Sequence, residues 1–158
     1  MRLTQYSTLL AILGLFLFGG ALPSNGATTA KIKKVLPFLL DKDGVNSVDP
    51  SLYERDAYQA YLRHNPKLQS GMRFDVQWKA SAADAPSLHV QIELRGIRDK
   101  TLTKRILTSK LTRKGWFSTW SSFRFTGEDY QEFGDLLAWR VTLWRGDMQV
   151  SEQKSFLW

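Results

Sequence analysis

Residues 71–80, GMRFDVQWKA, alternate apolar and polar side chains without a break. A period of two places successive side chains on opposite faces of an extended chain, whereas a helix needs a repeat of about 3.6 residues. We therefore predict a half-buried β-strand with one face toward a core. The side chains assigned to that face are those of Met72, Phe74, Val76 and Trp78.

Further segments repeat this pattern. Residues 87–95 and 136–145 alternate in the same way, and Gly146-Asp147 supplies a hairpin turn before a last strand over 148–158. Residues 31–40 suit a first strand, in which Pro37 indicates an edge or a bend, and the Thr-rich residues 101–112 suit one or two edge strands. The inward positions predicted on these strands are Leu88, Val90, Ile92, Leu94, Leu137, Trp139, Val141, Leu143, Val150, Phe156 and Trp158.

One segment departs from the strand pattern. Ser51 and Glu54 have the spacing of a capping box and Asn65-Pro66 is a stop signal, so we expect a short helix of about 12 residues within 51–64. It would cover one end or side of the sheets. Its predicted apolar stripe leaves Gln59 mostly outside and consists of Ala57, Tyr58, Tyr61 and Leu62. The acidic stretch 127–134 is expected to form one helical turn or a tight loop.

About seven short strands with turns between them and one inserted helix predict an all-β fold, an antiparallel immunoglobulin-like β-sandwich. The last third, LLAWRVTLWRGDMQVSEQKSFLW, resembles the final hairpin of an immunoglobulin-like or fibronectin type III-like sandwich. The chain departs from antibody-type domains in having no cysteine, and from fibronectin modules in its helix between the first two strands. The segments SLYERDAYQAYLR, FDVQWKA and SFLW together also resemble a family of uncharacterised exported bacterial proteins, which implies no activity.

The N-terminal segment has the organisation of a secretory signal peptide. Arg2 precedes an apolar run from Leu9 to Leu22, and small or polar residues follow up to Ala27. The run is shorter than the roughly 20 residues of a transmembrane helix, and no stop-transfer segment follows it. We predict a signal peptide over 1–27, a single domain over 28–158, export to the periplasm or the medium, and no transmembrane segment after cleavage. The lack of cysteine fits a bacterial envelope protein better than a eukaryotic secreted module.

Positive charge is concentrated in one segment. Residues 95–114 hold eight Lys or Arg side chains and a single Asp, a net charge of +7 that equals the formal charge of the whole chain. Two interpretations stay open. The cations protect an exposed edge hairpin from edge-to-edge aggregation, or they form a surface that attracts an anionic partner.

The stretch 113–125, RKGWFSTWSSFRF, offers a candidate ligand surface. As a strand it places Phe117, Phe123 and Phe125 toward the core and Trp116 and Trp120 outward, the two tryptophans on the order of 13 Å apart. Exposed rings can stack on sugars, and neighbouring cations can bind phosphate, uronate or sulfate. Alternatively, one or both tryptophans pack against the helix or a sheet edge, because two solvent-exposed tryptophan rings are energetically costly in a monomer. The candidate ligand-binding residues are Trp116, Trp120, Arg124, Arg113, Lys114, Lys104 and Arg105.

Motifs for metal binding or catalysis are missing from the sequence. His64 and His89 have no second histidine or cysteine at ligand spacing, so no zinc site is expected. A calcium loop around Gly44 would need carboxylates at its first and twelfth positions, which hold Leu39 and Pro50. The sequence contains no nucleophile elbow, P-loop or dinucleotide fingerprint, and we expect neither an enzyme nor a cofactor.

These observations favour a non-catalytic, exported binding or interaction module of the bacterial cell envelope that engages another protein. Trp144 and Arg140 form a second outward pair, expected on the sheet opposite Trp120, and tryptophan and arginine are common anchors of protein interfaces. The alternative is a module that binds a glycan or an anionic polymer through surface tryptophans and the basic strand. No nucleic-acid partner is expected.

Overall fold

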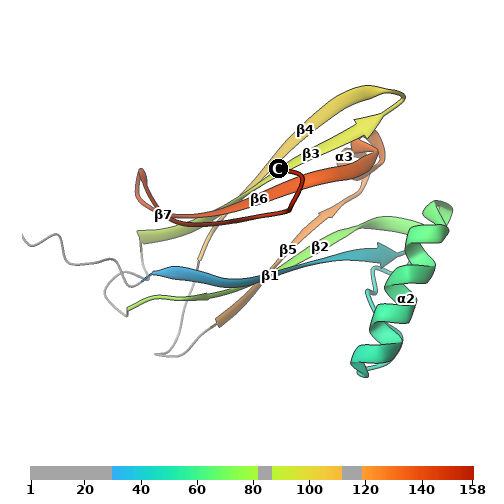
Figure 1. Cartoon of the computed structure of the whole chain (residues 1–158), viewed down its shortest axis with the longest axis horizontal. Coiled ribbons are helices and arrows are strands. Elements are labelled where there is room, and N and C mark those ends of the chain that lie inside the picture. Colours follow the sequence, from blue (N-terminus) through green and yellow to red (C-terminus); the bar gives the residue numbers. More distant parts are fainter. Residues whose placement is uncertain (1–29, 82–86, 112–118) are drawn as a thin grey trace, which may run out of the picture.

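The computed structural model describes residues 30–81, 87–111 and 119–158. Within them, seven antiparallel strands form two sheets that pack face to face (Figure 1). The three-stranded sheet has the order β1-β2-β5, with β1 at Lys31–Asp41, β2 at Gln69–Lys79 and β5 at Thr119–Thr126. The four-stranded sheet has the order β4-β3-β6-β7, with β3 at Leu88–Arg98, β4 at Thr101–Lys110, β6 at Asp135–Arg145 and β7 at Met148–Lys154. The predicted all-β antiparallel sandwich is confirmed.

Short helices lie in two of the connections. Helix α2 (Leu52–His64) and the 3-10 turn η1 (Pro66–Leu68) join β1 to β2, and α3 (Glu128–Phe133) joins β5 to β6. The helix predicted within 51–64 is therefore confirmed. Helix α2 lies at one end of the three-stranded sheet and extends away from the four-stranded sheet (Figure 1). It borders the outer face of the three-stranded sheet on one side (Figure 1).

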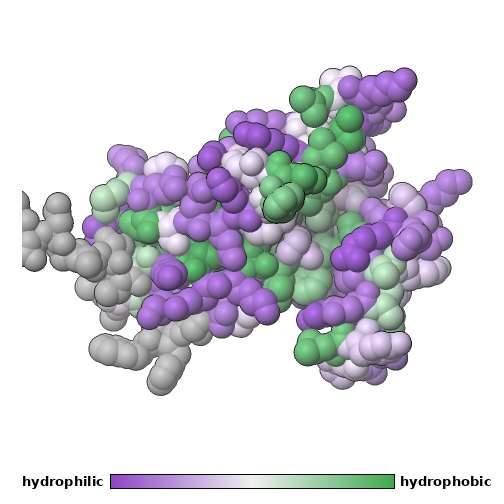
Figure 2. All heavy atoms as spheres, viewed as in Figure 1, coloured by the Kyte–Doolittle hydropathy of each residue, from purple (hydrophilic) through white to green (hydrophobic). Residues whose placement is uncertain are grey.

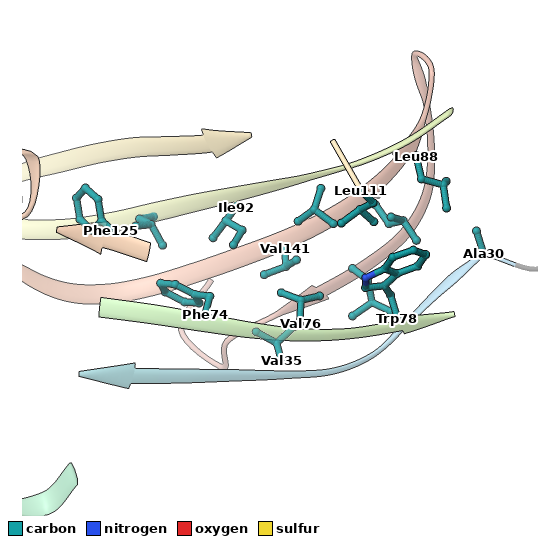
Figure 3. Packing of buried hydrophobic residues seen from close by; sticks show 14 of the residues in the cluster. Ala30, Val35, Phe74, Val76, Trp78, Leu88, Ile92, Leu111, Phe125 and Val141 are labelled. Atoms are coloured by element: carbon teal, nitrogen blue, oxygen red, sulfur yellow. The ribbon is translucent and has the colours of Figure 1, made fainter. Parts of the chain in front are cut away.

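The core lies between the sheets and follows the predicted alternation. Phe74, Val76 and Trp78 of β2 are fully buried and point toward Ile92 and Val141 of the facing sheet (Figure 3). Burial of each such side chain stabilises the fold by about 1.5–3 kcal/mol relative to exposure. This packing holds the sandwich together in a chain that has no cysteine.

The inward prediction for Leu137 is wrong. The register of β3 with β6 shifts where Arg95 pairs with Ala138 but Gly96 pairs with Leu136. Leu137 is the extra residue of this bulge and has no register partner on β3. Its side chain is 41% exposed, and Leu136 packs against the core instead. An extra residue in one strand reverses the faces of the side chains around it, which simple alternation does not anticipate.

The predicted last strand is too long. Strand β7 ends at Lys154, and residues 155–158 turn back over the outer face of the four-stranded sheet. Ser155 holds this turn, because its N–H donates to the carbonyl of Trp139 and its hydroxyl accepts from the Trp139 N–H. Phe156 is fully exposed, and the ring of Trp158 lies outside the core, so both predicted inward positions are wrong.

The buried face of α2 also differs from the prediction. Tyr61 is 51% exposed and Ala57 is exposed, whereas Gln59 is only 4% exposed. The Gln59 amide accepts from the N–H of Leu39 at 2.8 Å and donates to the carbonyls of Leu39 at 3.0 Å and Asn46 at 2.8 Å. Gln59 is buried because its side chain hydrogen-bonds the helix to β1 and to the loop that follows β1.

Candidate functional site

An open groove of about 270 Å³ lies on the outer face of the three-stranded sheet. Strands β1 and β2 form its floor, residues 46–50 and Arg55 line the side near α2, and Trp120 of β5 also lines it. Its lining residues are Leu36, Phe38, Asn46, Ser47, Asp49, Pro50, Arg55, Arg73, Asp75 and Trp120. The groove combines apolar floor residues with side chains of both charges.

The floor of the groove is organised around Phe38. The guanidinium carbon of Arg55 lies 5.2 Å from the centroid of the Phe38 ring, and that of Arg73 lies 5.6 Å from it. Arg73 also donates to Asp75 at 2.8 Å, and Asp75 accepts from the hydroxyl of Ser122 at 2.6 Å. The Nε atom of Arg73 is buried without a hydrogen-bond acceptor among the described residues. These contacts fix the two arginines in place before any ligand arrives.

Two of the predicted ligand-binding residues lie on β5, and of these Trp120 lines the groove. Trp120 is 46% exposed and pairs in register with Gln77, and the exposed Arg124 pairs with Arg73. Phe125 is buried on the opposite face of β5, as the alternation predicted. The guanidinium of Arg73 lies over Phe38 and is already paired with Asp75, whereas that of Arg124 lies beside Gly44. The predicted residues Arg113, Lys114 and Trp116 lie outside the described residues.

The other two predicted residues lie on β4, in the four-stranded sheet. The Nζ atom of Lys104 lies 3.8 Å from Glu93, and Arg105 lies 3.4 Å from Asp129 and 3.3 Å from Glu132. As neighbours in one strand, Lys104 and Arg105 point to opposite faces. The structure therefore brings neither of them together with Trp120, and it pairs both with carboxylates of the same chain.

The second outward pair is placed as predicted, on the outer face of the sheet opposite Trp120. The rings of Trp144 and His89 are parallel to within 8°, with centroids 6.2 Å apart. Arg140 donates to Glu93, whose side chain is only 8% exposed. A buried carboxylate is costly without its partner, so Arg140 has a structural role here.

The acidic turn after β1 is built by its own hydrogen bonds. The Asp41 carboxylate accepts from the N–H groups of Asp43 and Val45 and from the hydroxyl of Tyr58 at 2.6 Å. Burial opposes the ionisation of Asp41, but these hydrogen bonds outweigh it and lower its pKa. Among the described residues, no group of three or more His, Asp or Glu side chains is suited to a metal ion. None of the described helices is long and apolar enough to cross a membrane.

Sequence reasoning missed Phe38, Arg55, Arg73 and Asp75 as site residues. The alternation of β2 places Arg73 and Asp75 on the outer face, and both lie there in the structure. An arginine and an aspartate two residues apart in a strand share one face, and that spacing is a usable signal for a fixed charge pair. The contacts of Phe38 and Arg55 depend on the position of α2, which no local pattern specifies.

Comparison of the chain with protein-family models, curated proteins and solved structures found no match. The resemblance to fibronectin type III-like modules and to exported bacterial proteins therefore stays a prediction. The strand order and the groove are described by this structure alone.

Proposed function

We propose that this chain is a non-catalytic interaction module of the bacterial cell envelope, exported by its N-terminal segment. It engages another protein through the groove beside Trp120. The observation that carries the proposal is the exposure of Trp120, 46%, next to a floor of fixed arginines. Exposed tryptophan and pre-positioned arginine are the residue types that contribute most to protein interfaces.

The composition of the groove favours a protein over a polymer of one charge. Arg73 is paired with Asp75 at 2.8 Å, and Arg55 is paired with Asp56 of the same helix at 2.8 Å. The carboxylates of Asp49 and Asp75 line the same groove. A surface of mixed charge is complementary to a mixed surface, and such complementarity provides specificity. The order of the floor also reduces the entropy that binding would cost, because Arg73 is already held by Asp75.

A glycan or anionic polymer is the second candidate, because of one observation. Trp120 and Arg124 are both exposed on the outer face of β5, four residues apart, on the order of 13 Å. A ring and a cation at that spacing can contact two non-adjacent sugars of one uronate or sulfated polymer chain. This candidate now depends on Arg124 rather than on Lys104 and Arg105, which lie on the other sheet.

The test is photocrosslinking in the native host with a benzophenone amino acid in place of Trp120. The control carries the same amino acid at Lys67, which is exposed on η1 and does not line the groove. We expect a discrete adduct with one protein from position 120, absent from position 67 and undiminished when Arg124 is replaced by Ala.

Two results would contradict the proposal. The same adducts from both positions, or none from position 120, would remove the groove as a protein site. Retention of the purified domain on a sulfated polymer, abolished by Arg124→Ala and by moderate salt, would support the second candidate instead.

A further inference from the structure

The outer face of the four-stranded sheet carries an exposed apolar patch. It comprises Leu102 (76% exposed), Ile106 (51%), Leu137 (41%), Phe156 (101%) and Leu157 (71%). Hydrophobic side chains gather around the C-terminal end of the described chain and toward β4 (Figure 2). Exposed apolar side chains grouped in this way mark a surface that meets a partner or a membrane.

Segment 155–158 is anchored at both ends, so Phe156 and Leu157 are presented in a fixed position. Ser155 is bonded to the main chain of Trp139 at one end. At the other end, the ring of Trp158 lies 3.8 Å from the guanidinium carbon of Arg95 and 4.7 Å from that of Arg140. The two side chains between these anchors project into solvent.

The anchored segment reaches the apolar residues of β4. Trp158 contacts Arg95 of β3, and Arg95 pairs in register with Lys104 of β4. Leu102 and Ile106 lie on either side of Lys104 and share its outward face. The segment 155–158 and the apolar residues of the edge strand therefore lie on the same face of the sheet, with Arg95 and Lys104 between them.

Cations surround the patch and outnumber the carboxylates on the same face. The outward carboxylates of these strands are Glu93 and Glu152, and the outward cations are Arg95, Lys104, Lys110, Arg140 and Lys154. Glu93 is 6% exposed and is paired with Arg140 and Lys104, and Glu152 lies 3.8 Å from Lys154. With both carboxylates paired, the excess cations leave this face with a net positive charge. Lys104 is 60% and Lys154 53% exposed in their side chains. The face thus presents protruding apolar side chains within a positive surface.

We propose that this face binds the surface of an anionic phospholipid bilayer. Phe156 and Leu157 insert among the acyl chains near the headgroups, and Lys104 and Lys154 contact the negative headgroups. Apolar insertion and electrostatic attraction are the two terms that hold peripheral proteins on membranes. The site is on the opposite side of the sandwich from the Trp120 groove and does not depend on the proposed function.

Vesicle flotation tests this surface. The full domain 28–158 is mixed with vesicles of 30% phosphatidylglycerol and 70% phosphatidylcholine, and with vesicles of phosphatidylcholine alone. We expect binding to the anionic vesicles, weakened about tenfold by the double change Phe156→Ser/Leu157→Ser and by Lys104→Glu/Lys154→Glu. Trp120→Ala is the matched control and should bind the anionic vesicles like the parent chain. Because Trp120 lies in the groove on the other sheet, this control separates the membrane proposal from the groove proposal.

A fluorescent probe reports insertion directly. The chain has no cysteine, so an environment-sensitive dye can be attached to the single thiol of Leu157→Cys or of Trp120→Cys. The dye at position 157 should become brighter on the anionic vesicles, and the dye at position 120 should not.

Four results would overturn the proposal. Two come from flotation: no binding to anionic vesicles, or binding that neither double change weakens. The third is equal brightening of the dye at positions 157 and 120. The fourth is self-association of the protein that Phe156→Ser/Leu157→Ser abolishes while lipid binding stays the same.

Discussion

Gln59→Ala is the substitution that most directly tests how α2 is fixed to the sandwich. The Gln59 side chain is 4% exposed and makes three hydrogen bonds, two to the main chain of Leu39 and one to the carbonyl of Asn46. Alanine is the residue most compatible with a helix, so the change does not weaken α2 itself. Any loss of stability then reports the lost bridge between α2, β1 and the loop that lines the groove.

The expected loss is about 3 kcal/mol. Each hydrogen bond contributes about 1 kcal/mol net, and three main-chain groups lose their partner at once. Water can reach part of the space left by the amide, which keeps the loss below the full cost of three buried unsatisfied groups. For a domain of this size, about 3 kcal/mol corresponds to a decrease in Tm of roughly 10 °C.

Urea unfolding followed by tryptophan fluorescence measures the change, with Arg63→Ala as the control. Arg63 is exposed on the same helix, and its removal should change the free energy of unfolding by less than about 0.5 kcal/mol. Amide hydrogen exchange of residues 42–50 should become faster in Gln59→Ala, because the carbonyl of Asn46 is no longer held. A loss below about 1 kcal/mol, with unchanged exchange in this loop, would refute the bridging role.

Three further measurements test other parts of the structure. Trp120 is 46% exposed and Trp78 is fully buried. Trp120→Ala should therefore lower the free energy of unfolding by about 1–2 kcal/mol, and Trp78→Ala by about 3–5 kcal/mol. Equal losses for the two variants in urea unfolding would contradict this placement. The hydrogen bond to Asp41 raises the pKa of Tyr58 to about 12, so its stabilising contribution is complete below pH 10 and is lost as the pH rises through 12. NMR titration of the tyrosine rings measures this pKa, which Asp41→Asn should lower. Mass spectrometry of the protein from its native host should find a chain that begins near residue 28, and an uncleaved chain inside the cell would disprove export.

The sheets and the core face could be predicted because strand alternation is a local signal. Phe74, Val76 and Trp78 follow a strict period of two, and all three are fully buried between the sheets. The hairpin turn at Gly146 could be predicted for the same reason, since its φ of +56° is a conformation that glycine adopts without strain.

The errors share one physical origin, which is dependence on distant partners. Gln59 is buried only because Leu39 and Asn46 present main-chain groups to it. The outward position of Leu137 depends on a shift of register against β3. Trp158 was predicted inward because the last strand was continued to the end of the chain, yet its ring contacts the guanidinium of Arg95 on β3, which lies far away in the sequence. No pattern within a single segment contains this information.

In the basic segment, strand formation divides the positive charges between the two faces of the sheet. In the sequence, Lys104 and Arg105 belong to one cationic stretch, but as successive residues of β4 they face opposite sides of the sheet. Arg105 meets the acidic residues Asp129 and Glu132 of α3, and this ion pairing stabilises the position of that helix. Lys104 faces outward beside the apolar patch. A partner at the outer face therefore meets Lys104 but not Arg105, and apolar contact must supply much of the affinity of that face.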